Sequence, residues 1–521
     1  MNLIPYQNEP WRGTQGQWQL PDPCTVHYAD FASYCTNAYS ARCGVVMQPG
    51  GKDAALHLIR DTKLRSEEYF ITVSKSVTIT SATERGVIWA LTTLFLGTDN
   101  GAHECGSIND APRYRHRGFH FDSARHYFTV ETLESVLDTA GLVKMNTMHW
   151  HLTDDQGWRI ESEQYPLLTQ GGAFYTKEEI RRVVEFAKTR GIDVIPEIDL
   201  PGHTSAVLAA YPQFGCFNKN VPLRTGGGIF PIILCAGKDE ALLFIKDILT
   251  ETAELFPYGI FHIGGDEAPK SEWEQCPHCT ARMEAHGITE LEDLQGWLMV
   301  QAVEHLKTLG KRAMCWCDCL AARDFPRDVL VQQWMELTKE SRTLPFWRAG
   351  GEVVFSDGPY CYFDYPVAVT SLKKAYSYRP AIRGTDCSKA ANTRGVECCL
   401  WTENVETPKQ LGRMLFPRLF ATAEVGWSRT HDYARFERSL TRMLAYLDSH
   451  GIHYSTPADA NPTGKERKRQ LELFFSAVSS QDAASEGSVD TDMVSLIRLL
   501  RMVFGLKDLP LILRFLLKRK H

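Results

Sequence analysis

Apolar and polar positions follow two different patterns along the chain. Up to residue 111, short alternating runs predict strands, and one longer stretch has the apolar spacing of a helix. The predicted strands are 54–60, 69–75 and 77–80, and the predicted helix is 82–96. A polar run that ends at Gly106 closes this segment. We therefore predict a small α+β domain over residues 1–111.

Residues 112–450 instead alternate short strand-like runs with helical stretches. Eight runs predict strands, at 117–122, 147–152, 193–198, 259–264, 312–316, 329–334, 352–356 and 396–401. Helices are predicted at 130–143, 240–255 and 291–309, and a capping box at Thr176 and Glu179 opens another, which ends near Gly191. Strand–helix alternation indicates parallel βαβ units, and eight of them predict an α/β fold, a (β/α)8 TIM barrel. A doubly wound open sheet is the alternative, but no Gly-x-Gly-x-x-Gly follows a strand.

The segment 451–521 is predicted to be a helical extension. Small and polar residues near 479–490 are typical of a linker. Residues 493–521 are apolar and basic and predict two amphipathic helices. Such helices are able to lie on a membrane, but we expect them to pack on their own domain or on another subunit of a homo-oligomer.

Composition agrees with a globular protein of two or three domains. The chain has 521 residues, of which 44% are hydrophobic and 23% are charged. Its net charge of −6 gives it no general affinity for nucleic acid. Neither a signal-peptide pattern nor an apolar run of roughly 18 residues is present, and we expect a cytoplasmic protein.

The fifteen cysteines are a poor disulfide framework, because their number is odd and several are crowded, as in Cys398-Cys399. Cys276-Pro-His-Cys279 has the spacing of half a zinc site. No second matched pair accompanies it in the sequence. We therefore expect reduced, buried thiols, and predict neither a metal nor a cofactor.

Polar and aromatic residues follow the ends of the predicted strands, where barrels build their sites. Asp266 and Glu267 come after a strand and two glycines, which let a ligand approach the backbone. Alone, this pair is more typical of a helix N-terminal cap. The other strand ends carry Arg125, Asp154, His203, Trp316, Trp334, Tyr362, Asp364, Trp401 and Glu403.

Carboxylates beside aromatic rings suit glycoside chemistry. An acid protonates the leaving oxygen, an anion stabilises an oxocarbenium-like centre, and indole faces stack on sugar rings. No Gly-x-Ser-x-Gly motif is present, and no His-x-x-x-His pair lies within a predicted helix, so neither pattern points to another hydrolytic chemistry. His149 and His151 share one strand face, where they are core residues or support the site. Because Asp266 and Glu267 are consecutive, they suit a reaction in which the substrate supplies the nucleophile.

Five segments resemble glycoside hydrolase family 20, the β-N-acetylhexosaminidases. They are Arg117–Phe128, His149–Arg159, Pro201–His203, His262–Glu267 and Leu400–Glu403, in the order of the family. The resemblance runs from about Arg113 to Ser428, and the first hundred residues resemble the family's small α+β domain. It implies exo-acting, retaining hydrolysis of terminal β-linked N-acetylhexosamine (GlcNAc or GalNAc) from an oligosaccharide or glycoconjugate.

The resemblance also implies roles for the residues at the strand ends. The C2 acetamido oxygen of the substrate would form an oxazolinium intermediate, with Glu267 as general acid and then base. Asp266 would hold the acetamido N–H, and Asp154 and His203 would orient Glu267, with Asp155 as the alternative to Asp154. The substrate would contact the hydroxyl ligands Arg125, Asp364 and Glu403, the aromatic walls Trp316, Trp334 and Trp401, and the hydroxyl of Tyr362.

One segment departs from the family pattern. Many members have Asp-Glu or Gln-Glu after the Trp of the fifth strand, whereas this chain has Trp316-Cys317-Asp318-Cys319. Leaving-group contacts near this strand are therefore not implied. A specialised relative such as a lacto-N-biosidase and a non-catalytic glycan-binding barrel stay open as alternatives.

Overall fold

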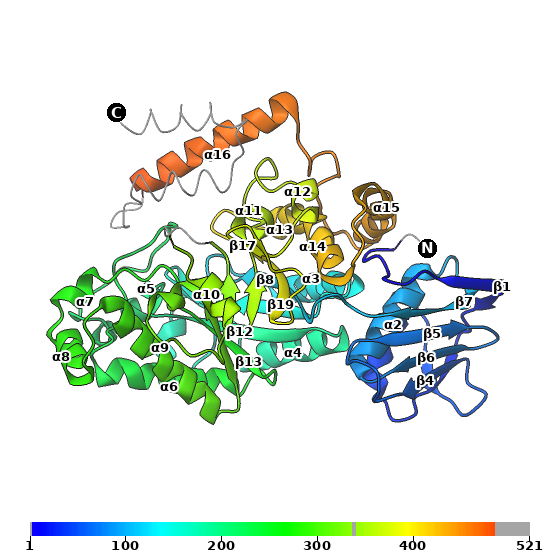
Figure 1. Cartoon of the computed structure of the whole chain (residues 1–521), viewed down its shortest axis with the longest axis horizontal. Helices are drawn as coiled ribbons and strands as arrows, with labels where there is room; N and C mark the ends of the chain where they lie inside the picture. Colours follow the sequence, from blue (N-terminus) through cyan, green and yellow to red (C-terminus); the bar gives the residue numbers. More distant parts are fainter. Residues whose placement is uncertain (1–2, 336–339, 485–521) are drawn as a thin grey trace.

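The computed structural model describes residues 3–335 and 340–484, which form an N-terminal sheet domain, a barrel and a C-terminal helix (Figure 1). The helices predicted within 493–521 lie outside the described residues. In the part that is described, no helix is long and apolar enough to cross a membrane.

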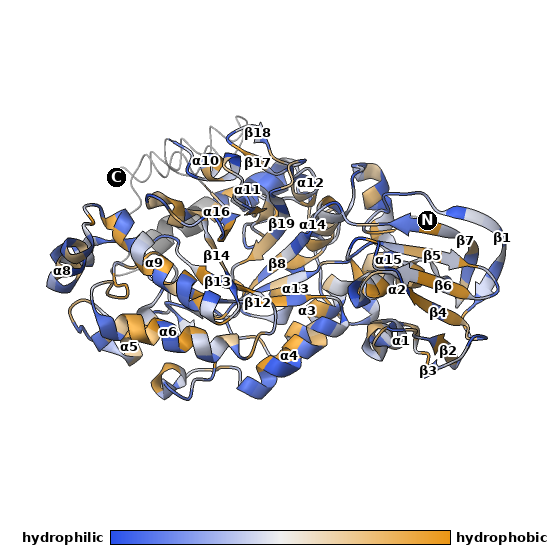
Figure 2. Ribbon diagram, turned by 60° about the horizontal axis from the view of Figure 1, so that its bottom comes forward, coloured by the Kyte–Doolittle hydropathy of each residue, from blue (hydrophilic) through white to orange (hydrophobic). Residues whose placement is uncertain are grey.

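The N-terminal domain is a seven-stranded sheet in the order β1-β7-β5-β6-β4-β2-β3. The strands are β1 (Arg12–Gln19), β2 (Cys24–His27), β3 (Met47–Pro49), β4 (Leu56–Arg60), β5 (Tyr69–Val73), β6 (Val77–Ser81) and β7 (Ala102–Asp110), and the helices are α1 (Asn37–Cys43) and α2 (Glu84–Gly97). Strands β4, β5, β6 and helix α2 confirm the prediction. Parts of β4 and β6 are orange in Figure 2, the colour that marks hydrophobic residues.

The polar run that was expected to close this domain is instead largely strand β7. Its buried side chains include Cys105 and His103, so the buried face carries no apolar alternation. In β1 only Trp18 is buried, so the sequence of that strand also shows no alternation from which it could be predicted. Helix α2 lies between the sheet and the barrel, with Trp89 against Gly191 (Figure 1).

Eight parallel strands close the barrel in the order β12-β13-β14-β15-β16-β19-β8-β9, which confirms the predicted TIM barrel. They are β8 (His116–Asp122), β9 (Thr147–His151), β12 (Asp193–Leu200), β13 (Ile260–Gly264), β14 (Arg312–Trp316), β15 (Leu330–Gln333), β16 (Val353–Phe355) and β19 (Thr393–Leu400). The outer helices include α3 (Val130–Leu142), α4 (Lys177–Thr189), α6 (Asp239–Ala253), α9 (Leu291–Thr308), α13 (Pro408–Leu415), α14 (Arg418–Trp427) and α15 (Tyr433–Ser449). The capping box of α4 is present, and Gly191 follows the helix with φ 75°.

Short elements occupy the barrel loops. They are β10 (Thr153–Asp154), β11 (Gly157–Trp158), α5 (Ser205–Ala210), α7 (Ser271–Gln275), α8 (Pro277–His286), α10 (Thr343–Arg348), α11 (Gly358–Cys361), α12 (Leu372–Tyr376), β17 (Ala381–Ile382) and β18 (Thr385–Asp386). Beyond the barrel, helix α16 (Gly464–Ala484) continues into the segment predicted as a linker. Leu471 on α16 is buried, and the Phe474 ring lies 6.1 Å from that of Tyr365.

A buried ion pair joins the two domains. Glu67, just before β5, pairs with Arg117 on β8, and also accepts hydrogen bonds from Trp89 Nε1 at 2.7 Å and Asn146 Nδ2 at 2.9 Å. Arg117 is fully buried. Glu67 therefore supplies the charge that Arg117 needs at this interface.

Replacing Glu67 by Ala is expected to lower the free energy of unfolding by about 3–5 kcal/mol, because the Arg117 charge stays buried without its partner. Urea unfolding at neutral pH measures this change. The control is Glu185→Ala, which removes an exposed carboxylate from its pair with Lys188 and is expected to cost less than about 1 kcal/mol. Equal losses in the two variants would contradict the prediction.

Candidate active site

The predicted site residues gather at the C-terminal ends of the barrel strands. Asp154 lies on β10, just after β9, and Trp316 is the last residue of β14. The others follow their strands directly or within a short loop: Arg125, His203, Asp266, Glu267, Trp334, Tyr362, Asp364, Trp401 and Glu403. The contacts described below connect them into one site.

The backbone turns sharply at the two carboxylates. Gly264 and Gly265 have φ of 63° and 103°, and a Cβ on Gly264 would lie 1.7 Å from Asp199 Oδ1. Only glycine fits there. Glu267 itself has φ 45°. The next helix, α7, has Lys270 at its N-cap and no side-chain capping hydrogen bond, so the helix-cap interpretation of Asp266 and Glu267 is wrong.

A chain of alternating carboxylates and imidazoles leads to Glu267. Buried His151 contacts Asp154 Oδ2 through Nε2 at 2.9 Å, and His203 Nδ1 contacts Asp154 Oδ1 at 3.1 Å. His203 Nε2 then lies 3.7 Å from Glu267 Oε2. Burial opposes the charge on His203, but Asp154 outweighs it and raises the pKa of the imidazole well above its usual value. A cationic imidazole therefore faces Glu267.

The structure favours Asp154 over Asp155 as the partner of His203. The Oδ1 atom of Asp155 accepts a hydrogen bond from the N–H of Ser205, the first residue of α5, at 2.9 Å. Its Oδ2 is 3.4 Å from His203 Nδ1, farther than Asp154 Oδ1. The main contact of Asp155 is therefore its hydrogen bond to the backbone at the start of α5.

Asp266 is buried beside two other acids. Its Oδ2 lies 4.0 Å from His203 Nε2, and its Oδ1 has no hydrogen-bond partner among the described residues. Burial raises the pKa of Asp266 to about 8, against the opposing effect of His203, and Glu267 and Asp318 raise it further. A buried acceptor without a partner is available to a ligand donor.

Arg125 connects the carboxylates on the opposite side. Its guanidinium contacts Asp154 Oδ2 at 2.7 Å, lies 3.6 Å from Glu403 Oε1, and stacks 4.9 Å from the ring centroid of Trp401. Burial raises the pKa of Glu403, against the opposing effect of Arg125. Burial also raises the pKa of Asp364, whose Oδ1 has no partner in the described part of the chain. The guanidinium of Arg125 and the carboxylates of Glu403 and Asp364 are groups that bind sugar hydroxyls through paired hydrogen bonds.

The predicted aromatic residues form one cluster with Tyr365, which the sequence did not single out. Trp334 stacks on Tyr362 with ring centroids 6.0 Å apart, and Trp401 lies 6.2 Å from Tyr362 and 5.9 Å from Trp316. These rings come from four different strand ends. They supply the apolar faces that a pyranose and its N-acetyl group need.

Asp318 is a site residue that the sequence interpretation did not assign. Its Oδ2 accepts a hydrogen bond from Trp334 Nε1 at 2.8 Å, and burial raises its pKa to about 6, with Glu267 as a further cause. The sequence could have identified Asp318 by its position two residues after Trp316 at the end of a predicted strand. Asp318 therefore occupies the region where the family pattern was interrupted.

Glu197 is a second such residue and contacts the aromatic cluster through Trp316. It accepts hydrogen bonds from Trp316 Nε1 at 2.8 Å and pairs with His262 Nδ1 at 2.9 Å and with His151. Burial opposes its charge, but the imidazoles outweigh burial and hold its pKa well below the usual value. His149, 3.2 Å from Glu197, belongs to this buried layer, so the two predicted histidines support the site.

Comparison with known proteins agrees with this geometry. A family model described as the glycosyl hydrolase family 20 catalytic domain matches residues 114–430. A β-hexosaminidase of Porphyromonas gingivalis is 36% identical over 383 residues, which are 68% of this chain and 49% of that protein. One of Akkermansia muciniphila is 33% identical over 422 residues, 74% of this chain and 85% of that protein. The chain thus spans about half the length of the Porphyromonas relative.

Solved structures show the same fold. A β-N-acetylhexosaminidase from Bacteroides fragilis has a TM-score of 0.81 and 28% identity, covering 89% of this chain and 99% of that one. An exo β-N-acetylglucosaminidase from Vibrio harveyi, solved with N-acetylglucosamine, has a TM-score of 0.78 and 28% identity, covering 88% and 78%. Since the family model matches more than half of the sequence, this chain belongs to glycosyl hydrolase family 20.

Proposed function

We infer that this chain is an exo-acting β-N-acetylhexosaminidase, a glycosidase that removes terminal β-linked N-acetylhexosamine from glycans. The observation that carries this inference is the pair Asp266 and Glu267. Glu267 lies 3.7 Å from a cationic His203, and buried Asp266 presents an unpartnered oxygen beside it, within the described residues. A glycan-binding protein needs no such acid, so the non-catalytic alternative is not favoured.

The geometry supports substrate-assisted catalysis. Glu267 donates its proton to the glycosidic oxygen while the C2 acetamido oxygen of the substrate attacks the anomeric carbon. Asp266 accepts a hydrogen bond from the acetamido N–H and offsets the positive charge of the oxazolinium ring. Glu267, now ionised, takes a proton from the water that opens this ring, and its neighbour His203 stabilises the carboxylate. Two inversions at the anomeric carbon retain its configuration.

A panel of chromogenic glycosides tests the proposed function. We expect cleavage of aryl β-N-acetylglucosaminide or β-N-acetylgalactosaminide, and none of the matching β-glucoside, which lacks the acetamide. A thiazoline that mimics the oxazoline intermediate is expected to compete with the substrate. Cleavage of the β-glucoside at a similar rate would contradict a substrate-supplied nucleophile. Activity only on a disaccharide unit would indicate the lacto-N-biosidase alternative.

Replacing Tyr362 by Phe is expected to lower kcat by about 10²-fold with a smaller change in KM, because its hydroxyl donates to the acetamido oxygen and orients it for attack on the anomeric carbon. Burial keeps this hydroxyl protonated, since it raises the pKa of Tyr362 well above the usual value. Steady-state kinetics on an aryl glycoside measure the change. Tyr454→Phe, which removes an exposed hydroxyl near Asp448, is the control and is expected to leave kcat unchanged.

A further inference from the structure

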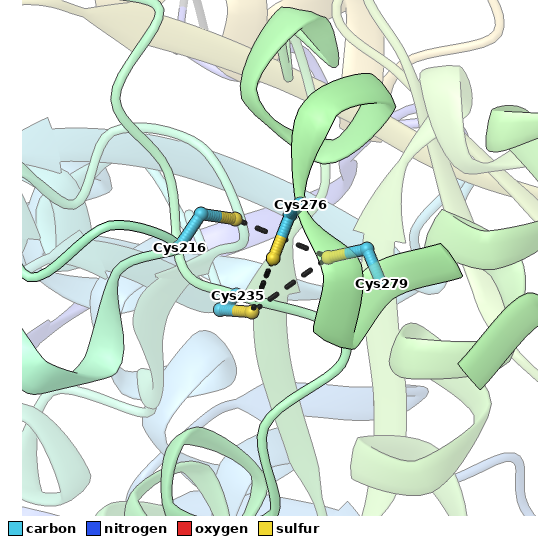
Figure 3. Close-up of side chains that lie close together, drawn as sticks. All are labelled: Cys216, Cys235, Cys276 and Cys279. Atoms are coloured by element: carbon cyan, nitrogen blue, oxygen red, sulfur yellow. Dashed lines mark hydrogen bonds between the residues drawn. The ribbon is translucent and has the colours of Figure 1, made fainter. Parts of the chain in front are cut away.

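Four cysteines that are far apart in the sequence bring their sulfurs together outside the active site. The Sγ–Sγ distances are 3.9 Å between Cys216 and Cys279, 3.8 Å between Cys235 and Cys276, and 3.6 Å between Cys235 and Cys279. All four residues are buried, and their sulfurs lie within 4.8 Å of one another. Figure 3 shows the side chains pointing to a common centre.

These distances fit a tetrahedral metal site. A Zn²⁺ ion holds four thiolates at about 2.3 Å, so the edges of the tetrahedron are about 3.8 Å long. A disulfide would require about 2.05 Å between two sulfurs. We propose that Cys216, Cys235, Cys276 and Cys279 bind a structural Zn²⁺ ion. The thiols lose their protons when the metal binds, and the closed set of four thiolates leaves no position for a substrate.

The local backbone is shaped for such a site. Cys276 is the N-cap of α8 and Cys279 lies in its first turn, where helix N–H groups stabilise thiolates. Gly237 packs against this turn so closely that a Cβ on it would lie 2.1 Å from the carbonyl carbon of His278. The N–H of Cys235 donates to the carbonyl of Phe214 at 2.9 Å, which holds the two loop cysteines side by side.

The metal would connect the two loops that carry the catalytic residues. Cys216 and Cys235 belong to the connection after β12, which also carries His203. Cys276 and Cys279 belong to the connection after β13, which carries Asp266 and Glu267. A second link between these connections is the ion pair of Lys219 with Glu272 at 2.7 Å. The zinc ion thus fixes the base of both loops and acts on catalysis only through their positions.

The segment between Cys216 and Cys235 reaches the active site. The carbonyl of Gly226 accepts a hydrogen bond from Gln156 Nε2 at 2.7 Å, and Gln156 in turn accepts one from Arg125 at 3.1 Å. A Cβ on Gly227 would lie 3.4 Å from Glu403 Cγ. Release of zinc is therefore expected to raise KM through this segment more than it lowers kcat.

The test measures metal in the purified full-length chain, prepared without a metal-affinity step. Elemental analysis is expected to find about one zinc per chain, and Cys279→Ala is expected to lose most of it. Cys24→Ala removes an equally buried thiol outside the cluster and is expected to keep the zinc. Substitution by Co²⁺ gives a readout that is independent of activity and of the variants, because four thiolates produce strong charge-transfer and tetrahedral d–d bands.

Chelator treatment of the unaltered protein is expected to lower Tm and raise KM, and Zn²⁺ but not Mg²⁺ is expected to restore both. The proposal is overturned if the protein holds no stoichiometric metal, if it holds iron instead, or if mass spectrometry finds disulfides among these four cysteines. These outcomes do not depend on the proposed glycosidase activity. An inactive protein that contains zinc would contradict only the proposed function.

Discussion

Replacing Glu267 by Gln is expected to reduce kcat by about 10²- to 10⁴-fold while the enzyme still binds product. The amide preserves the shape of the side chain but neither donates the proton to the leaving oxygen nor accepts one from water. Because a poor leaving group needs more protonation, the loss is expected to be larger for a disaccharide than for an aryl glycoside. Steady-state kinetics on both substrates measure this difference.

Two comparisons make this result specific. Glu185→Gln changes an exposed carboxylate of α4 and is expected to leave both rates unchanged. Binding of the thiazoline to the Glu267→Gln variant, followed by calorimetry, shows whether the site is still folded. A variant that binds the thiazoline and turns over a disaccharide within tenfold of the unaltered rate would exclude Glu267 as the acid.

Replacing Asp266 by Asn is expected to lower activity and raise stability at once. The amide neither offsets the oxazolinium charge nor accepts the acetamido N–H in the same way, so kcat is expected to fall by about 10²- to 10³-fold with a smaller change in KM. The carboxylate is also costly to the folded protein, because burial raises its pKa from 3.8 to about 8. Function and stability therefore make opposite demands on this position.

The stability effect has a defined pH window. Between pH 3.8 and about 8, Asp266 of the folded, ligand-free protein keeps a proton that the unfolded chain has lost, so the free energy of unfolding falls as the pH rises. The positive charge of the bound oxazolinium ring favours the ionised form of Asp266, which is the form that acts in the reaction. Asn removes this pH dependence. Near pH 3.8, the free energy of unfolding of the variant is expected to equal that of the unaltered protein. Near pH 8 it is expected to be higher by at least about 1.4 kcal/mol, which corresponds to a pKa difference of one. Urea unfolding across this window measures the difference, and a constant difference would argue against a raised pKa.

The barrel could be predicted because eight short strand-like runs alternate with helical spacing, even though strands such as β8 and β9 carry buried polar residues among the apolar ones. Parallel strands then place their C-terminal ends together, which brings Arg125, Asp266 and Trp401 into one site without any knowledge of side-chain positions. In the N-terminal domain, β1 and β7 were missed because their buried faces carry few apolar residues. Strands β2 and β3 were missed because they have only four and three residues, too few for a visible alternation.

Contacts between distant loops could not be predicted from local patterns. Cys216 and Cys235 lie 63 and 41 residues from their partners Cys279 and Cys276, and no spacing rule pairs them. Asp318 reaches Trp334 only because the chain turns after β14. The cysteine cluster and the contact between Asp318 and Trp334 both depend on how the loops fold in three dimensions, and the spacing of apolar residues carries no information about that.

The segment between Cys216 and Cys235 is anchored at both ends, and its middle part near Gly226 and Gly227 is expected to tolerate changes in sequence and length. Its two ends are held together at one point of the scaffold, so lengthening it adds little loop-closure entropy, only about 0.6 kcal/mol for each doubling. Its middle part, near Gly226 and Gly227, lies beside Glu403 and Gln156. Replacing the residues around Gly226 and Gly227, with the buried residues Val221, Ile233 and Leu234 kept, is therefore expected to change glycan selectivity without redesign of the barrel or of Glu267.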